Sequence, residues 1–198
     1  MRSKCLTLAL AAVLLAGCKV AHVPDTLTAK FGADDPDAQM EFWHELAQRP
    51  LASNDEATHA LLLFVDGKAG SLPYEQRVAA MKERKLLPKG FSSPADETVF
   101  RGTVAYALAH ALNIRGGLTM RTFGNNPRYA TRELTDLGLF PMSSTRQTFS
   151  GTELVGVFGK AEDFQRGGGG EKTPGGLAGN VDQHQPQSGT PPQPTTRP

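Results

Sequence analysis

The chain has 198 residues, with 21 Lys and Arg against 20 Asp and Glu, and two cysteines, Cys5 and Cys18. A formal net charge of +1, with basic residues scattered singly, argues against a nucleic-acid-binding protein. The balance hides an asymmetry, because residues 32–66 hold eight acids and one base, whereas residues 101–160 hold seven bases and three acids. We expect the acidic and the basic segment to attract each other within one fold. The alternative is that they form two surfaces of opposite charge that contact different partners.

The first 17 residues have the layout of a bacterial secretory signal peptide, with Arg2 and Lys4 before a short apolar run. The run is shorter than the roughly 20 residues that span a bilayer. It ends in Leu15-Ala16-Gly17-Cys18, which resembles the lipobox of bacterial lipoproteins. That resemblance implies cleavage before Cys18 and lipidation of its thiol. An ordinary secretory signal with an incidental cysteine is the alternative.

Composition divides the rest of the chain into three parts. Residues 18–34 lack a strong periodic spacing of apolar residues and are predicted to be a tether between the membrane and the domain. Residues 35–165 have the size and apolar content of one domain. Residues 166–198 are rich in Gly, Pro and Gln and almost devoid of apolar residues, so we expect a disordered tail. A mature chain that begins at a lipidated Cys18 would carry no free thiol, which excludes disulfides, cysteine-ligated zinc and cysteine nucleophiles.

The domain is predicted to be mainly α, because helix start signals recur along it. Asp35 before Pro36 has the form of an N-cap with proline at the first helical position. The inner face of that helix is predicted to carry Met40, Trp43 and Ala47. Ser53 and Glu56 have the spacing of a capping box, which opens a second helix that ends at Asp66-Gly67. A third helix is predicted from about Pro73.

Two segments, about 72–114 and 128–164, repeat one pattern. Each has a helix, a Leu-apolar-Pro corner (Leu86-Leu87-Pro88 and Leu139-Phe140-Pro141), a polar loop and a final helix that follows Phe-x-Gly-Thr. A unit of this kind cannot bury its apolar face alone, so we expect neighbouring units to stack. The fold prediction is therefore two helix–loop–helix repeats plus N-terminal helices, with a minor strand at 117–124, where polar and apolar residues alternate.

The repeated pattern resembles S-layer homology modules, which are helix–loop–helix repeats that usually assemble in threes and bind cell-wall polysaccharide. The likeness covers most of the domain. The Thr-Arg-Ala-Glu signature of that family has no good match, because the corresponding positions hold Phe100-Arg101-Gly102-Thr103 and Phe149-Ser150-Gly151-Thr152. What the resemblance implies is a shared helical shape and, as an alternative function, binding of a wall or surface glycan.

No constellation in the sequence predicts catalysis, a metal or a cofactor. His44-Glu45 lacks the second histidine of the zincin pattern, because Gln48 stands in its place. His59 and His110 each occur alone, and no Gly-x-Ser-x-Gly elbow is present. An enzyme whose site is assembled from dispersed residues is the alternative.

Three arginines, Arg121, Arg128 and Arg132, lie near Asn126 and a helix start. Together they are a candidate contact for an anion or a glycan, such as a carboxylate or phosphate on a wall polymer. Arginines that are simply solvated or paired with acids of the same helix are the alternative.

These observations predict a lipid-anchored, non-catalytic cell-envelope protein that acts as a structural or interaction module. Its partners would be a membrane, through Cys18, and an envelope protein or cell-wall polymer. The expected location is the cell membrane or outer membrane, facing the periplasm or the exterior.

Overall fold

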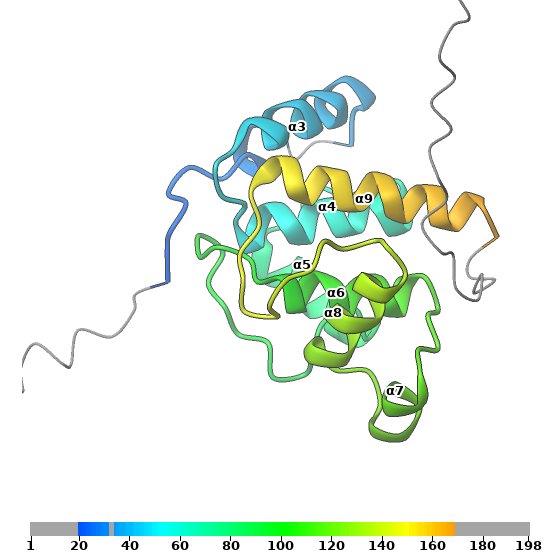
Figure 1. Cartoon of the computed structure of the whole chain (residues 1–198). Coiled ribbons are helices and arrows are strands. Elements are labelled where there is room, and N and C mark those ends of the chain that lie inside the picture. Colours follow the sequence, from blue (N-terminus) through cyan, green and yellow to red (C-terminus); the bar gives the residue numbers. More distant parts are fainter. Residues whose placement is uncertain (1–19, 32–33, 169–198) are drawn as a thin grey trace, which may run out of the picture.

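The computed structural model describes residues 20–31 and 34–168, and the predictions for the signal peptide, for Cys18 and for nearly all of the tail lie outside this part of the chain. The described part is mainly helical, as predicted (Figure 1). Its helices are α2 (Thr28–Phe31), α3 (Pro36–Gln48), α4 (Asn54–Asp66), α5 (Tyr74–Glu83), α6 (Arg101–Ala111), α7 (Leu118–Phe123), α8 (Pro127–Asp136) and α9 (Gly151–Arg166). Within these residues no helix is long and apolar enough to cross a membrane.

The predicted caps are present and explain where several helices begin. The Asp35 side chain accepts a hydrogen bond from the backbone N–H of Ala38 at the start of α3. Ser53 and Glu56 form a complete capping box at the start of α4, and Ser150 and Glu153 form a second one at the start of α9. Since each box satisfies otherwise unpaired N–H groups, the sequence sets these helix starts locally.

Helix α4 is the centre of the domain. All of its residues from Asn54 to Leu63 are buried, so it is covered on every side. It packs against α2, α5, α6 and α9. Around it, α3 lies along α9, and α6 lies along α8.

The domain contains three units of similar construction, where the sequence predicted two. The pairs α3–α4, α5–α6 and α8–α9 each consist of a helix, a corner with proline (Pro50, Pro88 or Pro141), an extended segment and a second helix. The α3–α4 unit has almost no loop, because its extended segment directly follows Pro50. At the start of its second helix, Ala52-Ser53-Asn54-Asp55 stands where α9 has Phe149-Ser150-Gly151-Thr152, so this unit lacks the Phe-x-Gly-Thr signal of the other two.

The three extended segments bond pairwise and form a closed ring at the N-terminal ends of α4, α6 and α9. Residues 49–54 bond to 149–151 on one side and to 97–99 on the other, and 101–102 bond to 145–147. The six N–H to O bonds measure 2.8–3.0 Å; they are Ala52 to Phe149, Gly151 to Arg49, Val99 to Ala52, Asn54 to Glu97, Arg101 to Gln147 and Gly102 to Thr145. Because each segment satisfies the backbone of both neighbours, the three units assemble as one body.

The glycines of the two Phe-x-Gly-Thr motifs lie where units meet. A Cβ atom on Gly151 would come 1.6 Å from the carbonyl oxygen of Leu46, at the end of α3. A Cβ on Gly102 would come 2.2 Å from Cγ2 of Thr145. Both positions therefore require glycine for close approach of a neighbouring unit, not for a left-handed backbone.

Residues 21–31, which the sequence assigns to a tether, contact the domain instead. The N–H of Val23 donates to the carbonyl of Asp96 (2.7 Å), and the N–H of Thr98 donates to the carbonyl of Ala21 (3.0 Å). Val23 and Leu27 are buried. Hydrogen bonds to α4 add to this burial, because the N–H of Leu27 donates to Glu56 (3.3 Å) and the hydroxyl of Thr28 donates to Asp55.

Two further predictions were wrong. Residues 118–123 form helix α7, not a strand. No neighbouring strand is available among the described residues to satisfy their backbone groups, and helical bonds such as that from the Arg121 N–H to the Gly117 carbonyl (3.1 Å) satisfy them locally. On α3, Met40 is 68% exposed, while Phe42 and Leu46 are the buried residues of that helix. The inner face of α3 is thus rotated, since Phe42 packs against His59 of α4 (ring centroids 4.6 Å apart) and Trp43 packs against Phe158 of α9 (5.5 Å).

Candidate anion-binding cavity

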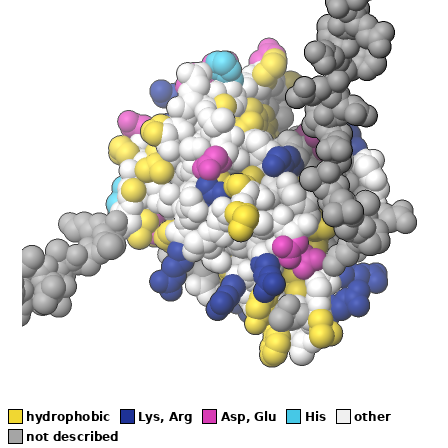
Figure 2. All heavy atoms as spheres, in the orientation of Figure 1, with side chains coloured by type: hydrophobic (Ala, Val, Ile, Leu, Met, Phe, Trp, Pro, Cys, Tyr) yellow, Lys and Arg dark blue, Asp and Glu magenta, His cyan; other side chains and the backbone are white. Residues whose placement is uncertain are grey.

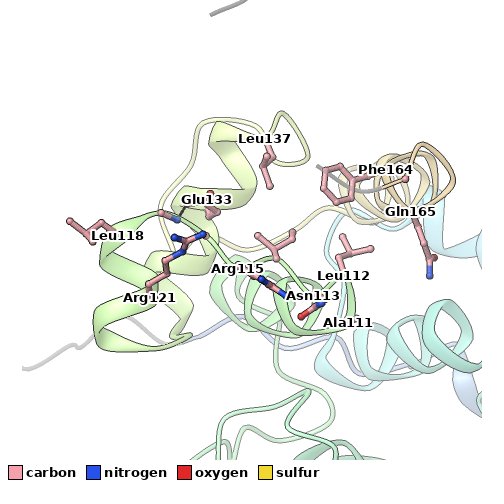
Figure 3. Close-up of a pocket in the computed structure, with 14 residues that line it drawn as sticks. Ala111, Leu112, Asn113, Arg115, Leu118, Arg121, Glu133, Leu137, Phe164 and Gln165 are labelled. Atoms are coloured by element: carbon pink, nitrogen blue, oxygen red, sulfur yellow. Dashed lines mark hydrogen bonds between the residues drawn. The ribbon is translucent and has the colours of Figure 1, made fainter. Parts of the chain in front are cut away.

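An open cavity of about 920 Å³ lies where the C-terminal ends of α6 and α9 meet α7 and α8 (Figure 3). After α6 the chain turns sharply, because Asn113 and Gly116 both have left-handed backbone angles, with φ of 51° and 60°. This turn places α7 beside α8 and leaves the cavity between them and the end of α9. The volume lies within the range of small-ligand sites, roughly 300–1,000 Å³.

Three charged side chains line the cavity: Arg115, Arg121 and Glu133. Arg115 comes from the turn after α6, Arg121 from α7 and Glu133 from α8. One carboxylate oxygen of Glu133 accepts a hydrogen bond from the N–H of Gly117 (2.9 Å), which holds the start of α7 against α8. In Figure 3 the guanidinium of Arg121 points towards Glu133, and Arg115 lies on the adjoining part of the wall. The three groups carry a formal charge of +1.

The rest of the wall is largely apolar. Leu137, directly after α8, and Phe164 of α9 lie near each other at one side of the cavity, with Leu112 beside Phe164 (Figure 3). Asn113 and Gln165 add amide groups at the edge. Such a wall suits a ligand that has both an anionic group and a less polar body.

The C-terminal end of α6 meets the cavity with its last carbonyl groups already hydrogen-bonded. The last carbonyls of α6 already accept hydrogen bonds: Leu108 from Leu112, Ala109 from Ile114 and His110 from Asn113. These bonds satisfy the carbonyl groups that carry the partial negative charge of a helix C-terminus. Two guanidinium groups, each with several N–H donors, are then the strongest ligand-binding groups in the wall.

The structure separates the three arginines that the sequence grouped together. Arg121 lines the cavity, whereas Arg128 and Arg132 are exposed on successive turns of α8 and are absent from its wall. Figure 2 shows several dark blue side chains over the region of α7 and α8, next to yellow ones. Sequence reasoning missed Arg115, although its position directly before Gly116-Gly117 marks it as part of a turn after a helix.

A second group of polar side chains is buried at the start of α4. The Arg77 guanidinium pairs with the Asp55 carboxylate and donates to the carbonyl of Leu72 (2.7 Å). Burial and the positive charge of Arg77 lower the pKa of His59 to about 4. Burial also raises the pKa of Tyr74, whose hydroxyl donates to the carbonyl of Ser93 (2.8 Å). All four groups lie away from the cavity wall, so their contribution is to the packing of α4 against α5.

The remaining candidate residues are dispersed. His44 is exposed on α3, and His110 is exposed near the end of α6; neither lines the cavity. Within the described ranges, no group of three or more His, Cys, Asp or Glu is placed to hold a metal ion. Cys18 precedes the first described residue.

Comparison of the chain with protein-family models, with curated proteins and with solved structures finds no match. The function must therefore be argued from the geometry of the cavity and from the sequence.

Proposed function

We propose that the protein is a lipid-anchored, non-catalytic binding module of the cell envelope, and that its ligand is an anionic group carried by an envelope component. The observation that supports this most directly is the pair Arg115 and Arg121 in the wall of an open cavity whose other side is apolar. Guanidinium groups bind carboxylates and phosphates with directed, charge-assisted hydrogen bonds. The lipid anchor is proposed from the sequence Leu15-Ala16-Gly17-Cys18.

The proposed ligand is a carboxylated or phosphorylated polymer, not a small metabolite. The cavity is open to solvent, and Arg115, Gly116 and Gly117 of its wall belong to the loop between α6 and α7. Exposed Arg128 and Arg132 on α8 extend the positive charge beyond the cavity. A polymer with repeated negative charges would contact the arginines in the cavity and those on α8, whereas a single anion would contact only the arginines in the cavity.

The test is a binding measurement with the full mature chain and two matched double variants. Fluorescent oligogalacturonate serves as the carboxylated probe, and a neutral maltooligosaccharide of similar length serves as its control. Arg115→Ala with Arg121→Ala should weaken binding of the acidic probe about tenfold or more, because each lost charge-assisted hydrogen bond is worth about 1.5–3 kcal/mol. Arg128→Ala with Arg132→Ala removes the same charge outside the cavity and should have a smaller effect.

A binding site elsewhere would give a different result. Equal loss in the two double variants would mean that charge alone attracts the probe and that the cavity is not its site. Equal binding of the acidic and neutral probes would contradict the anionic ligand class.

A glycan-binding module of the S-layer homology type is the second candidate. The observation that favours it is the ring that joins three helix–corner–helix units, since those modules usually assemble in threes. Binding of a neutral wall polysaccharide that persists in both double arginine variants would support this candidate over the first.

A further inference from the structure

The N-terminal segment and the cavity lie at opposite ends of the same helices. Ala21 accepts a hydrogen bond from Thr98, three residues before α6 begins at Arg101. Asp25 accepts one from Arg49, whose own carbonyl bonds to the N–H of Gly151 at the start of α9. The cavity, in contrast, is lined by residues at the C-terminal ends of α6 and α9, such as Leu112 and Phe164.

The two ends are well separated. Helix α6 has 11 residues and α9 has 16, which correspond to lengths of roughly 16 and 24 Å at 1.5 Å per residue. In Figure 1 the described chain enters at the left, α9 runs from its yellow start on the left to its orange end on the right, and α7 lies at the lower right.

The distance available between the lipid site and the domain is short. Only Lys19 and Val20 separate Cys18 from Ala21, which is the first residue with a hydrogen bond to the domain among those the structure describes. Three residue steps reach about 10 Å at most. A lipid on Cys18 would therefore hold Ala21, and with it the segment before α6 to which Ala21 bonds, within about that distance of the lipid site.

We infer that the protein lies on the membrane in one orientation, with the ring of N-terminal helix ends against the lipid headgroups and the cavity facing away from the bilayer. This inference rests on the proposed lipidation of Cys18. It deepens the proposed function, because the ligand must then approach from the side opposite to the membrane. Arg115 and Arg121 would be directed towards a polymer or protein beyond the headgroup layer, and not towards the phosphates of the lipids that hold the anchor. The exposed apolar residues of α7, Leu118 and Phe123, belong to the same distal end.

The experiment measures the depth of two sites in the lipidated full-length protein on phosphatidylcholine vesicles that contain a nitroxide headgroup lipid. If Cys18 is lipidated, a single added cysteine is the only free thiol of the mature chain and can be labelled selectively. Pro24→Cys places a fluorophore at the proximal end, and Thr122→Cys places one on α7; both positions are exposed. Quenching of the Pro24 probe should be severalfold stronger than quenching of the Thr122 probe.

A long Gly-Ser insertion between Val20 and Ala21 is the control, because it should reduce the difference between the two probes. Quenching of the Thr122 probe that equals or exceeds that of the Pro24 probe would overturn the inference and would show that the apolar tip of α7 enters the bilayer instead. Mass spectrometry of the same preparations separates the two proposals. Absence of a lipid adduct on Cys18 would refute the anchor and the orientation together, whereas an intact adduct with equal quenching would refute the orientation alone.

Discussion

Arg101 and Glu153 join the first turns of α6 and α9 through a guanidinium–carboxylate pair of 2.6 Å, although 52 positions separate them in the sequence. The Arg101 side chain is 2% exposed, donates from Nε to the carbonyl of Thr148 (3.2 Å) and lies over the ring of Phe149, 4.9 Å from its centroid. Glu153 belongs at the same time to the capping box of α9. One buried cation thus connects the helix starts of two units.

Replacement of Arg101 by alanine should destabilise the domain by about 2 kcal/mol, mainly because it leaves a cavity beside Phe149 at a 2% exposed position. The lost ion pair adds little, since the Glu153 side chain is 43% exposed and keeps access to water. The control is Arg166→Ala on the exposed end of α9, where the partner is Asp163 at 2.6 Å and both side chains are more than 70% exposed. That change should cost less than about 0.5 kcal/mol. Urea denaturation measures both values, and similar small losses would mean that Arg101 does not hold the two units together.

The pKa of Glu153 makes the same contact sensitive to acid. Partial burial raises this pKa, but hydrogen bonds from Ser150 and Arg101 and the charge of Arg101 outweigh that effect and leave it below its usual value. A depressed carboxyl pKa contributes stability above the pKa of the unfolded chain and loses it as the pH falls through the folded value. We expect Glu153→Gln to reduce stability at pH 7 and to weaken the acid dependence below about pH 4.5. An unchanged acid slope in this variant would assign the dependence to other carboxylates.

The free energy of unfolding should also depend on pH at milder acidity, because of His59. Its pKa is about 4 in the folded chain, against an ordinary value of 6.5. Between these values the unfolded chain binds a proton that the folded chain excludes, so the free energy of unfolding should fall by up to about 3 kcal/mol as the pH drops from 6.5 to 4. Neither ring nitrogen has a hydrogen-bond partner among the described residues. His59→Leu should therefore flatten this slope and change stability at pH 7 by less than about 1.5 kcal/mol; denaturation at a series of pH values would show a persisting slope if another group caused it.

Two glycines of α9 should respond to alanine in opposite directions. Gly151→Ala places a Cβ 1.6 Å from the Leu46 carbonyl oxygen, so the ring must open or shift, at a cost of about 3 kcal/mol. Gly159, later in the same helix, is exposed, and a Cβ added there would have no other atom within 4 Å beyond its own helix backbone and chain neighbours. Gly159→Ala should stabilise the domain by about 0.5–1 kcal/mol through helix propensity. Thermal unfolding compares the two variants, and a neutral Gly151→Ala would contradict the close contact between α3 and α9.

The N-terminal segment should contribute to the stability of the domain. Leu27 is 4% exposed, and its N–H donates to the buried carboxylate of Glu56 (3.3 Å). Leu27→Ala should cost about 2–3 kcal/mol. Lys30→Ala, an exposed change in the short helix α2 that follows Leu27, should have little effect. A Leu27→Ala loss as small as that of Lys30→Ala would restore the view of residues 18–34 as a free tether.

Much of the local structure could be predicted from the sequence because its signals are short-range. The caps at Asp35 and Ser53 act over three or four residues and are present as expected, and Asn126 and Ser150 cap α8 and α9 by the same short-range contacts. Position 40 shows the limit of this reasoning. Helical periodicity indicates which residues share a face, but the neighbouring helices decide which face is buried, and Phe42 packs against His59 of α4 while Met40 is exposed.

The residues that line the candidate cavity could be predicted only in part from the sequence. Arg121 was predicted as a contact, but Arg128 and Arg132 were grouped with it because they are close in sequence. The left-handed turn at Asn113 and Gly116 brings Arg115 to the cavity instead, and that turn places α7 against α8 only in the folded chain.

By itself, the sequence determined the helical class, most helix starts and two of the three repeated units, because capping and periodicity are encoded within a few neighbouring residues. It also carries the proposed lipidation site at Cys18. Only the tertiary structure decided that the α3–α4 unit completes a ring, that residues 21–31 join the domain and that the cavity lies at the end opposite to them. Each of these depends on hydrogen bonds or packing between residues far apart in the chain, whose partners no local pattern specifies.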